Sequence, residues 1–186
     1  PCPNFNDAPN PQEALEDFVV YRNFMKTGDW NEAFSYWQKV YKVAPAADGQ
    51  RNTLLADGIT FYEVFAQNQP DPEIKKTYID RIFELYDQIH QCYPEGGYVD
   101  GRKAFDLYYK YQTRESQEEV YRLFKSSFDQ DFPEVQDFII NPFTALLVDL
   151  YANQKISVEE ARDYVFKILE AVEKGVADCE NEECDR

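Results

Sequence analysis

The segment from Tyr21 to Pro45, YRNFMKTGDWNEAFSYWQKVYKVAP, constrains the fold more than any other part of the chain. Its apolar residues recur at the three- and four-residue spacing of amphipathic helices, on both sides of a break at Gly28. Asp29 follows the break and can cap a second helix, which Pro45 ends. Two amphipathic helices joined by so short a turn predict an antiparallel helical hairpin.

The spacing within this hairpin matches the tetratricopeptide pattern W-x2-L-G-x2-Y, A-x3-F and P, although Asp17 stands at the Trp position. A second, looser unit follows, because the distance from Ile82 to Pro94 repeats the distance from Ala33 to Pro45. Later units keep only scattered small and aromatic positions. The residues expected to pack the repeats are Tyr21, Phe24, Gly28, Ala33, Trp37, Pro45, Gly58, Phe61, Tyr86 and Pro94.

The rest of the chain also has helical periodicity, and alternating strand patterns are weak. We therefore expect an all-α, TPR-like right-handed α-α superhelix of about eight antiparallel helices in four hairpins. The helices are predicted at residues 11–26, 30–44, 50–67, 72–91, 98–113, 116–130, 141–153 and 157–177, with a short helical turn at 135–140.

The domain organisation follows from composition. Residues 1–10 are rich in Pro and Asn and predict an irregular lead-in. Residues 11–177 form the predicted helical repeat domain, and residues 178–186 form an acidic tail that contains two cysteines.

The net charge of −16, from 19 Lys and Arg against 35 Asp and Glu, limits the partners. Binding to nucleic acid or to an anionic membrane needs clustered cations, so neither is expected. No apolar run approaches the roughly 20 residues of a transmembrane helix. The charge has two interpretations, which are solubility and a basic partner.

Cys2, Cys92, Cys179 and Cys184 allow three disulfide pairings. Cys179 and Cys184 are nearest in sequence and could close a small C-terminal loop. A zinc site is not expected, because His90 is the only histidine and no C-x2-C motif occurs. We predict no metal and no cofactor, and the cysteines favour an oxidising compartment.

Catalytic motifs are weak, and we predict that the chain is not an enzyme. His90 and Cys92 are two residues apart and do not share a helix face. Neither a nucleophile elbow nor a nucleotide-binding loop occurs. Carboxylate pairs keep open the alternative of a hydrolase; these are Glu118/Glu119, Glu159/Glu160 and Glu182/Glu183.

The segments FMKTGDWNEAFSYWQKVYKVAP, ADGITFYE and YVDGRKAFDLYYKY resemble the N-terminal repeat region of exported, mostly uncharacterised TPR proteins of Bacteroidota, over about residues 17–177. The resemblance implies a cleaved leader and a location in the periplasm or at the outer membrane or cell surface. Because the only Met is Met25, the chain is expected to be a mature form or a fragment.

In TPR proteins the first helix of each hairpin lines a concave face that meets a protein or peptide partner. Further repeats of the same chain are an alternative partner, and a carbohydrate at the outer membrane is an alternative ligand. Core packing competes with binding for the aromatic members, while the cations could hold a carboxylate. The predicted partner-binding residues are Arg22, Met25, Lys26, Asn52, Leu55, Tyr62, Arg102, Phe105, Tyr108 and Tyr109.

Overall fold

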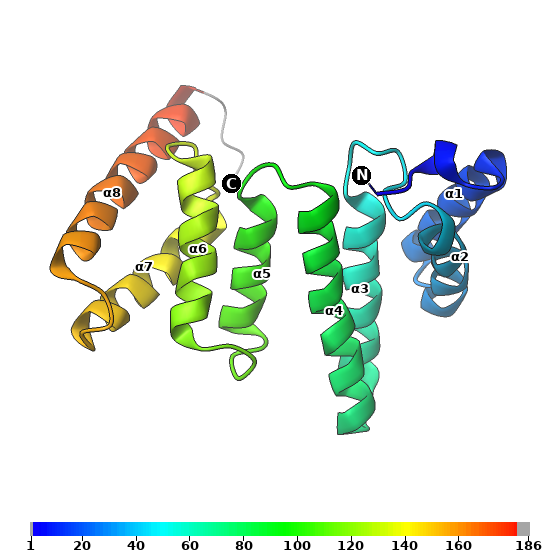
Figure 1. Ribbon diagram of the computed structural model, residues 1–186, viewed down its shortest axis with the longest axis horizontal. Coiled ribbons are helices and arrows are strands. Elements are labelled where there is room, and N and C mark those ends of the chain that lie inside the picture. The colour runs from blue at the N-terminus through cyan, green and yellow to red at the C-terminus, as the bar shows by residue number, and fades with distance from the viewer. Residues whose placement is uncertain (1, 182–186) are drawn as a thin grey trace. The chain divides into compact units, whose positions relative to one another are not determined.

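The computed structural model describes residues 2–181, and this range is helical without any strand (Figure 1). The prediction of an all-α protein with eight α-helices is therefore confirmed. A 3-10 turn, η1 (Phe5–Asp7), precedes them. The helices are α1 (Pro11–Thr27), α2 (Trp30–Val43), α3 (Thr53–Asn68), α4 (Pro72–Cys92), α5 (Tyr98–Tyr109), α6 (Gln117–Asp131), α7 (Asp137–Ala152) and α8 (Val158–Asn181).

The chain divides into two compact units, unit 1 (Pro1–Glu95) and unit 2 (Gly96–Arg186). This boundary falls inside the range that the sequence suggests as one repeat domain. Each unit contains two hairpins of consecutive, closely packed helices, α1/α2 and α3/α4 in unit 1 and α5/α6 and α7/α8 in unit 2. The right-handed superhelix remains a prediction.

Several helices begin at capping residues that the sequence predicts. The side-chain oxygens of Asn10, Asp29 and Asp71 each accept a hydrogen bond from a backbone N–H in the first turn of the following helix. Gly28 ends α1 in the left-handed region, at φ 77°, where a residue without a Cβ is favoured. Ser116 caps α6 by accepting from the N–H of Glu119.

Three predicted helix boundaries are wrong by four residues, and the first is the end of α8, which continues to Asn181 instead of residue 177. α7 begins at Asp137 and contains Pro142, whereas the sequence suggested a separate turn followed by a helix from Asn141. Proline removes one helical hydrogen bond, yet Pro142 and Phe143 are both buried, so packing outweighs that loss. α5 ends at Tyr109 instead of residue 113, because the carbonyl of Asp106 accepts from two N–H groups beyond the helix end.

The core of unit 1 joins its two hairpins through Trp37 of α2. The indole Nε1–H of Trp37 donates a 2.8 Å hydrogen bond to the carbonyl of Leu54 in α3. One turn further along α3, Gly58 lies so close to the indole that an added Cβ would be 2.5 Å from its Cζ2 atom. Ala33 is fully buried in α2. The small residues at these positions therefore let the helices approach closely.

The N-terminal segment is tied to the rest of unit 1. Cys2 forms a disulfide with Cys92 at the end of α4, with 5.5 Å between the Cα atoms. The backbone N–H of Phe5 donates to the carbonyl of Ala47, and the N–H of Ala46 donates to that of Pro3. These residues belong to the connection between α2 and α3, so the lead-in spans both hairpins.

Unit 2 has a corresponding core, centred on Phe143 of α7. Its ring lies 5.3–6.4 Å from the rings of Tyr121, Phe124 and Phe128 in α6. In α8, Tyr164 donates to both carboxylate oxygens of Asp129 in α6, at 2.8 and 2.7 Å. In unit 1, Phe61 of α3 is likewise buried against the preceding hairpin, at 5.7 Å from the ring of Trp37.

Candidate functional site

Four residues of α5 form one solvent-facing line, and we call them, together with Phe138 of α7, the α5 stripe. They are Tyr98, Arg102, Phe105 and Tyr109, at spacings of four, three and four residues. Residues at this spacing lie on one face of a helix. Tyr98 and Tyr109 are 52% and 50% exposed, so both ends of the stripe are open to a ligand.

The aromatic rings of the stripe contact one another in sequence. The Phe138 ring lies 5.8 Å from Tyr98 and 5.7 Å from Phe105, both edge to face. Phe105 continues to Tyr109 at 4.6 Å between centroids. Such ring pairs stabilise each other beyond simple burial, so the stripe is a preformed surface with restricted side chains.

Arg102 occupies the middle of the stripe. Its Cζ atom lies 5.3 Å from the Phe105 ring centre and 5.4 Å from the Phe138 ring centre. The structure gives its guanidinium no hydrogen bond or ion pair with another described residue. A guanidinium over aromatic rings still has N–H donors that can bind a carboxylate in two parallel hydrogen bonds.

The start of α5 is fixed by close packing on α6. A Cβ on Gly97 would lie 2.2 Å from the carbonyl oxygen of Ser127, so only glycine permits this contact. The N-terminus of α5 has no cap from its own side chains; instead, Asp131 of α6 accepts from the N–H of Gly97 at 2.8 Å. Asp100, which is buried, accepts from Ser126 of α6. These contacts hold the face that carries the stripe.

Three of the predicted partner-binding residues lie on the stripe, namely Arg102, Phe105 and Tyr109. Tyr108 is half-buried and lies 4.7 Å from the Tyr109 ring at its edge. Two members of the stripe, Tyr98 and Phe138, are not among the predicted residues. Tyr98 could have been predicted from helical spacing, because it stands four residues before Arg102. Phe138 could not, because it lies before the predicted start of its helix.

The predicted residues of unit 1 are distributed differently. Leu55 and Tyr62 are buried in the core, and Asn52 is half-buried at the N-terminus of α3, so a partner cannot reach the first two in this structure. Lys26 is exposed and Met25 is half-buried. Arg22 forms a 3.5 Å ion pair with Asp57, whose pKa is raised by burial.

The predicted repeat-packing residues occupy mixed environments. Tyr21, Ala33, Trp37, Phe61 and Tyr86 are buried, and Gly58 is buried against Trp37. Phe24 is half-buried and stacks on Tyr36, at 5.9 Å. Pro45 is half-buried, whereas Pro94 and Gly28 are exposed at helix ends.

Several of the groups considered for catalysis are engaged in structural contacts. Cys92 is disulfide-bonded, so its thiol is not available as a nucleophile beside His90. Glu118 pairs with Lys155 at 3.1 Å, and Glu160 pairs with Lys125 at 2.7 Å. Glu182 and Glu183 lie outside the described residues.

Three further structural findings concern the predictions on metals, cysteines and membranes. Among the described residues, no group of three or more His, Cys, Asp and Glu side chains is placed to hold a metal ion. Cys179 is disulfide-bonded, and Cys184, its predicted partner, lies outside the described residues. Within residues 2–181, no helix has the length and hydrophobicity needed to cross a membrane.

Comparisons with models of known protein families, with curated proteins and with solved structures found no match for this chain. The class of the protein therefore follows from the structure alone. It is an all-helical protein built from four packed helical hairpins, two in each compact unit.

Proposed function

We propose that the chain is a non-enzymatic scaffold that binds a segment of a protein or peptide along the α5 stripe. The observation that carries this proposal is Arg102, whose guanidinium lies over the rings of Phe105 and Phe138 without an ion pair to another described residue, in a chain of net charge −16. In such a chain, an arginine without an ion pair to another described residue is a specific binding group for an anionic ligand atom.

The geometry favours a ligand with both a carboxylate and apolar groups. The carboxylate would bind the guanidinium, and apolar side chains or rings would lie on Tyr98 and Tyr109 at either end. Exposed tyrosines supply large contact areas at a low cost in conformational entropy, which is why they are enriched at binding surfaces.

The resemblance of the sequence to exported TPR proteins of Bacteroidota supports a periplasmic or surface location. The disulfide between Cys2 and Cys92 is compatible with that setting, because disulfides persist in oxidising compartments. Stacked hairpins whose first helices present a binding face are also typical of such repeats.

Selection from a random peptide library tests the proposal. The wild-type protein is expected to enrich peptides that contain Asp, Glu or a free C-terminus next to apolar residues. Arg102→Ala is expected to lose these peptides, whereas Arg122→Ala, which removes an exposed cation on α6, is expected to keep them. No enrichment, or equal enrichment by Arg102→Ala, would remove the proposal.

Carbohydrate binding is a second candidate, favoured by the two half-exposed tyrosines of the stripe. Aromatic faces can stack on sugar rings without any charged group. A glycan array separates the two functions: a glycan signal lost in Tyr109→Ala and retained in Arg102→Ala would support the carbohydrate and contradict carboxylate recognition.

A further inference from the structure

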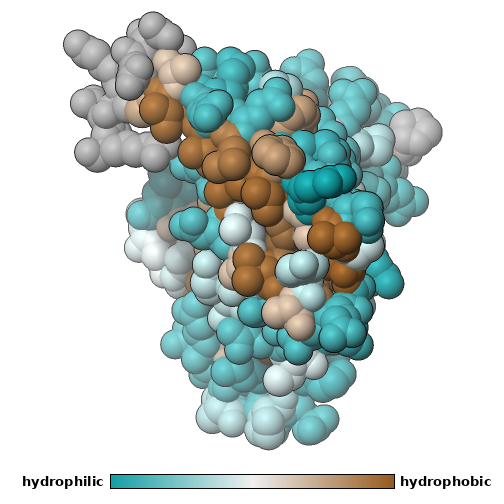
Figure 2. Space-filling view, turned by 90° about the vertical axis from the view of Figure 1, so that its left-hand side faces the viewer, coloured by the Kyte–Doolittle hydropathy of each residue, from teal (hydrophilic) through white to brown (hydrophobic). Residues whose placement is uncertain are grey.

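α8 presents a row of apolar side chains to solvent. Val165, Leu169, Val172 and Val176 recur at spacings of four, three and four residues and are each 43–54% exposed. Figure 2 looks onto the side of unit 2 that carries α7 and α8, and hydrophobic residues form a band across it. A contiguous exposed apolar band marks an interaction surface more often than a solvated face.

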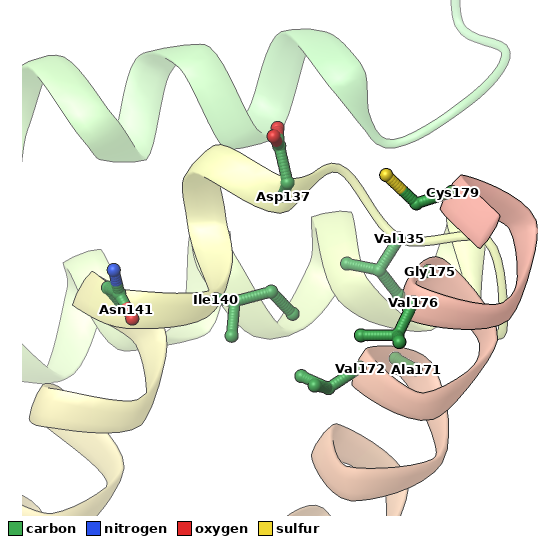
Figure 3. Close-up of a pocket in the computed structure, with 9 residues that line it drawn as sticks. All are labelled: Val135, Asp137, Ile140, Asn141, Ala171, Val172, Gly175, Val176 and Cys179. Carbon is green, nitrogen blue, oxygen red and sulfur yellow. The ribbon is translucent and has the colours of Figure 1, made fainter. Parts of the chain in front are cut away.

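Beside this row, the first turn of α7 and the last turns of α8 enclose a hollow of about 420 Å³. Ile140 of α7 and Val172 and Val176 of α8 point into it, whereas the carboxylate of Asp137 points away (Figure 3). Gly175 forms part of the wall, and an added Cβ there would meet no atom within 4 Å. The hollow and the row together form what we call the α7–α8 groove.

In each unit, the first hairpin has a surface that corresponds to the α7–α8 groove, and the helix that follows this hairpin covers it. α3 brings Phe61 against Tyr21 of α1 and Trp37 of α2, at 6.2 and 5.7 Å between ring centres. α7 brings Phe143 against the aromatic residues of α6 and contacts α5. Thus a hairpin of this chain accepts an amphipathic helix with a large apolar side chain, and α7–α8 presents the same kind of surface.

The charges around the groove decide which helix fits. Helices α7 and α8 together carry nine Asp and Glu but only three Lys and Arg. Lys167 and Lys174 already pair with Asp163 and Asp178 on α8. Glu170 and Glu173 form no ion pair with another described residue. A second copy of the chain would bring the same negative charges to the interface, whereas a basic helix would complement them.

We propose that the α7–α8 groove binds an amphipathic helix of a partner polypeptide that has Lys and Arg on its polar face. Its apolar face covers Val165, Leu169 and Val172 and places one large side chain in the hollow at Gly175. The site is separate from the α5 stripe, and the proposal does not depend on the function proposed for that stripe. Helix-in-groove recognition of this type uses anchors at three- and four-residue spacings.

Two synthetic helical peptides test the charge requirement. Both have about 18 residues, or five turns, with the same Leu and Phe face, and they carry either Lys or Glu on the polar face. In fluorescence anisotropy with the full chain, the Lys peptide is expected to bind about tenfold or more tightly than the Glu peptide. Binding of the Lys peptide should weaken as salt is added.

Two substitutions of one residue test the location. Gly175→Trp, whose Cβ would meet no atom within 4 Å, is expected to occupy the hollow and weaken binding of the Lys peptide about tenfold, whereas Gly175→Ala leaves the hollow open and keeps binding. Circular dichroism confirms that both variants fold. The proposal is overturned if the two peptides bind equally, if neither binds, or if Gly175→Trp binds like the wild type. A concentration-dependent dimer that Gly175→Trp disrupts would overturn it in favour of a second copy.

Discussion

The hydroxyl of Tyr21 in α1 donates a 2.8 Å hydrogen bond to the Oδ2 atom of Asp57 in α3, and so joins the first helices of two successive hairpins. Tyr21 is fully buried, and Arg22 reaches the same carboxylate oxygen at 3.5 Å. Burial raises the pKa of Asp57, although the hydrogen bond from Tyr21 and the charge of Arg22 oppose this shift. The contact between Tyr21 and Asp57 therefore makes the stability of unit 1 sensitive to pH.

Asp57→Asn tests this sensitivity. Because the folded pKa of Asp57 is raised above 3.8, the native state holds this proton to a higher pH than the unfolded state does. The wild type should therefore lose stability relative to Asp57→Asn as the pH rises from about 3.8 through the folded pKa. Urea unfolding of both proteins over a pH series measures the difference. A difference that stays constant with pH would show that Asp57 does not titrate in this way.

Gly58 and Gly175 form a matched pair for testing the close contact with Trp37. Replacing glycine by alanine in a helix interior normally stabilises it by about 1 kcal/mol. Gly175→Ala should do so, whereas Gly58→Ala should destabilise the protein by about 1–3 kcal/mol, since its Cβ would overlap the indole. Thermal unfolding of the two variants gives the sign directly, and stabilisation by Gly58→Ala would contradict the packing described.

The disulfide between Cys2 and Cys92 closes a loop with a sequence separation of 90 residues. Cross-linking so long a loop restricts the unfolded chain, so Cys2→Ser with Cys92→Ser should lower the free energy of unfolding by about 2–5 kcal/mol. Urea unfolding without reductant measures this loss. Peptide mapping under non-reducing conditions should recover the two cysteines in one linked fragment; a link from Cys2 to any other cysteine would refute the pairing.

Asp131 of α6 accepts a hydrogen bond from the N–H of Gly97 at the start of α5. Removing the Asp131 side chain should therefore lower the stability of unit 2. Asp131→Ala is expected to cost about 1 kcal/mol, the usual net contribution of one hydrogen bond. Asp131→Asn keeps an acceptor oxygen for the N–H of Gly97 and should cost less. Asp163→Ala, which removes an exposed ion pair on α8, serves as the control. Equal stability of all three variants would show that the cap contributes nothing.

Much of the local structure could be predicted because it depends on residues within one or two helical turns. The caps at Asn10, Asp29 and Asp71 and the break at Gly28 are of this kind. The start of α7 could not be predicted in this way, because Pro142 is a strong local signal against a helix and only tertiary burial overrides it.

The same limit explains which parts of the site were missed. Arg102, Phe105 and Tyr109 share a helix, so their common face can be derived from spacing alone. Phe138 joins them from α7 through tertiary packing, which no local pattern encodes. The pairing of Cys2 with Cys92 is likewise a long-range contact, and four cysteines leave three pairings open.

We propose that the chain binds a carboxylate-containing peptide on the α5 stripe. The most direct measurement is a two-dimensional amide NMR titration of the full chain with a selected peptide, repeated with Arg102→Ala. Peptide binding at the stripe should produce shifts that cluster at Tyr98, Arg102, Phe105, Tyr109 and Phe138 and that disappear in the variant. Shifts that cluster in unit 1, or that persist unchanged in Arg102→Ala, would contradict it.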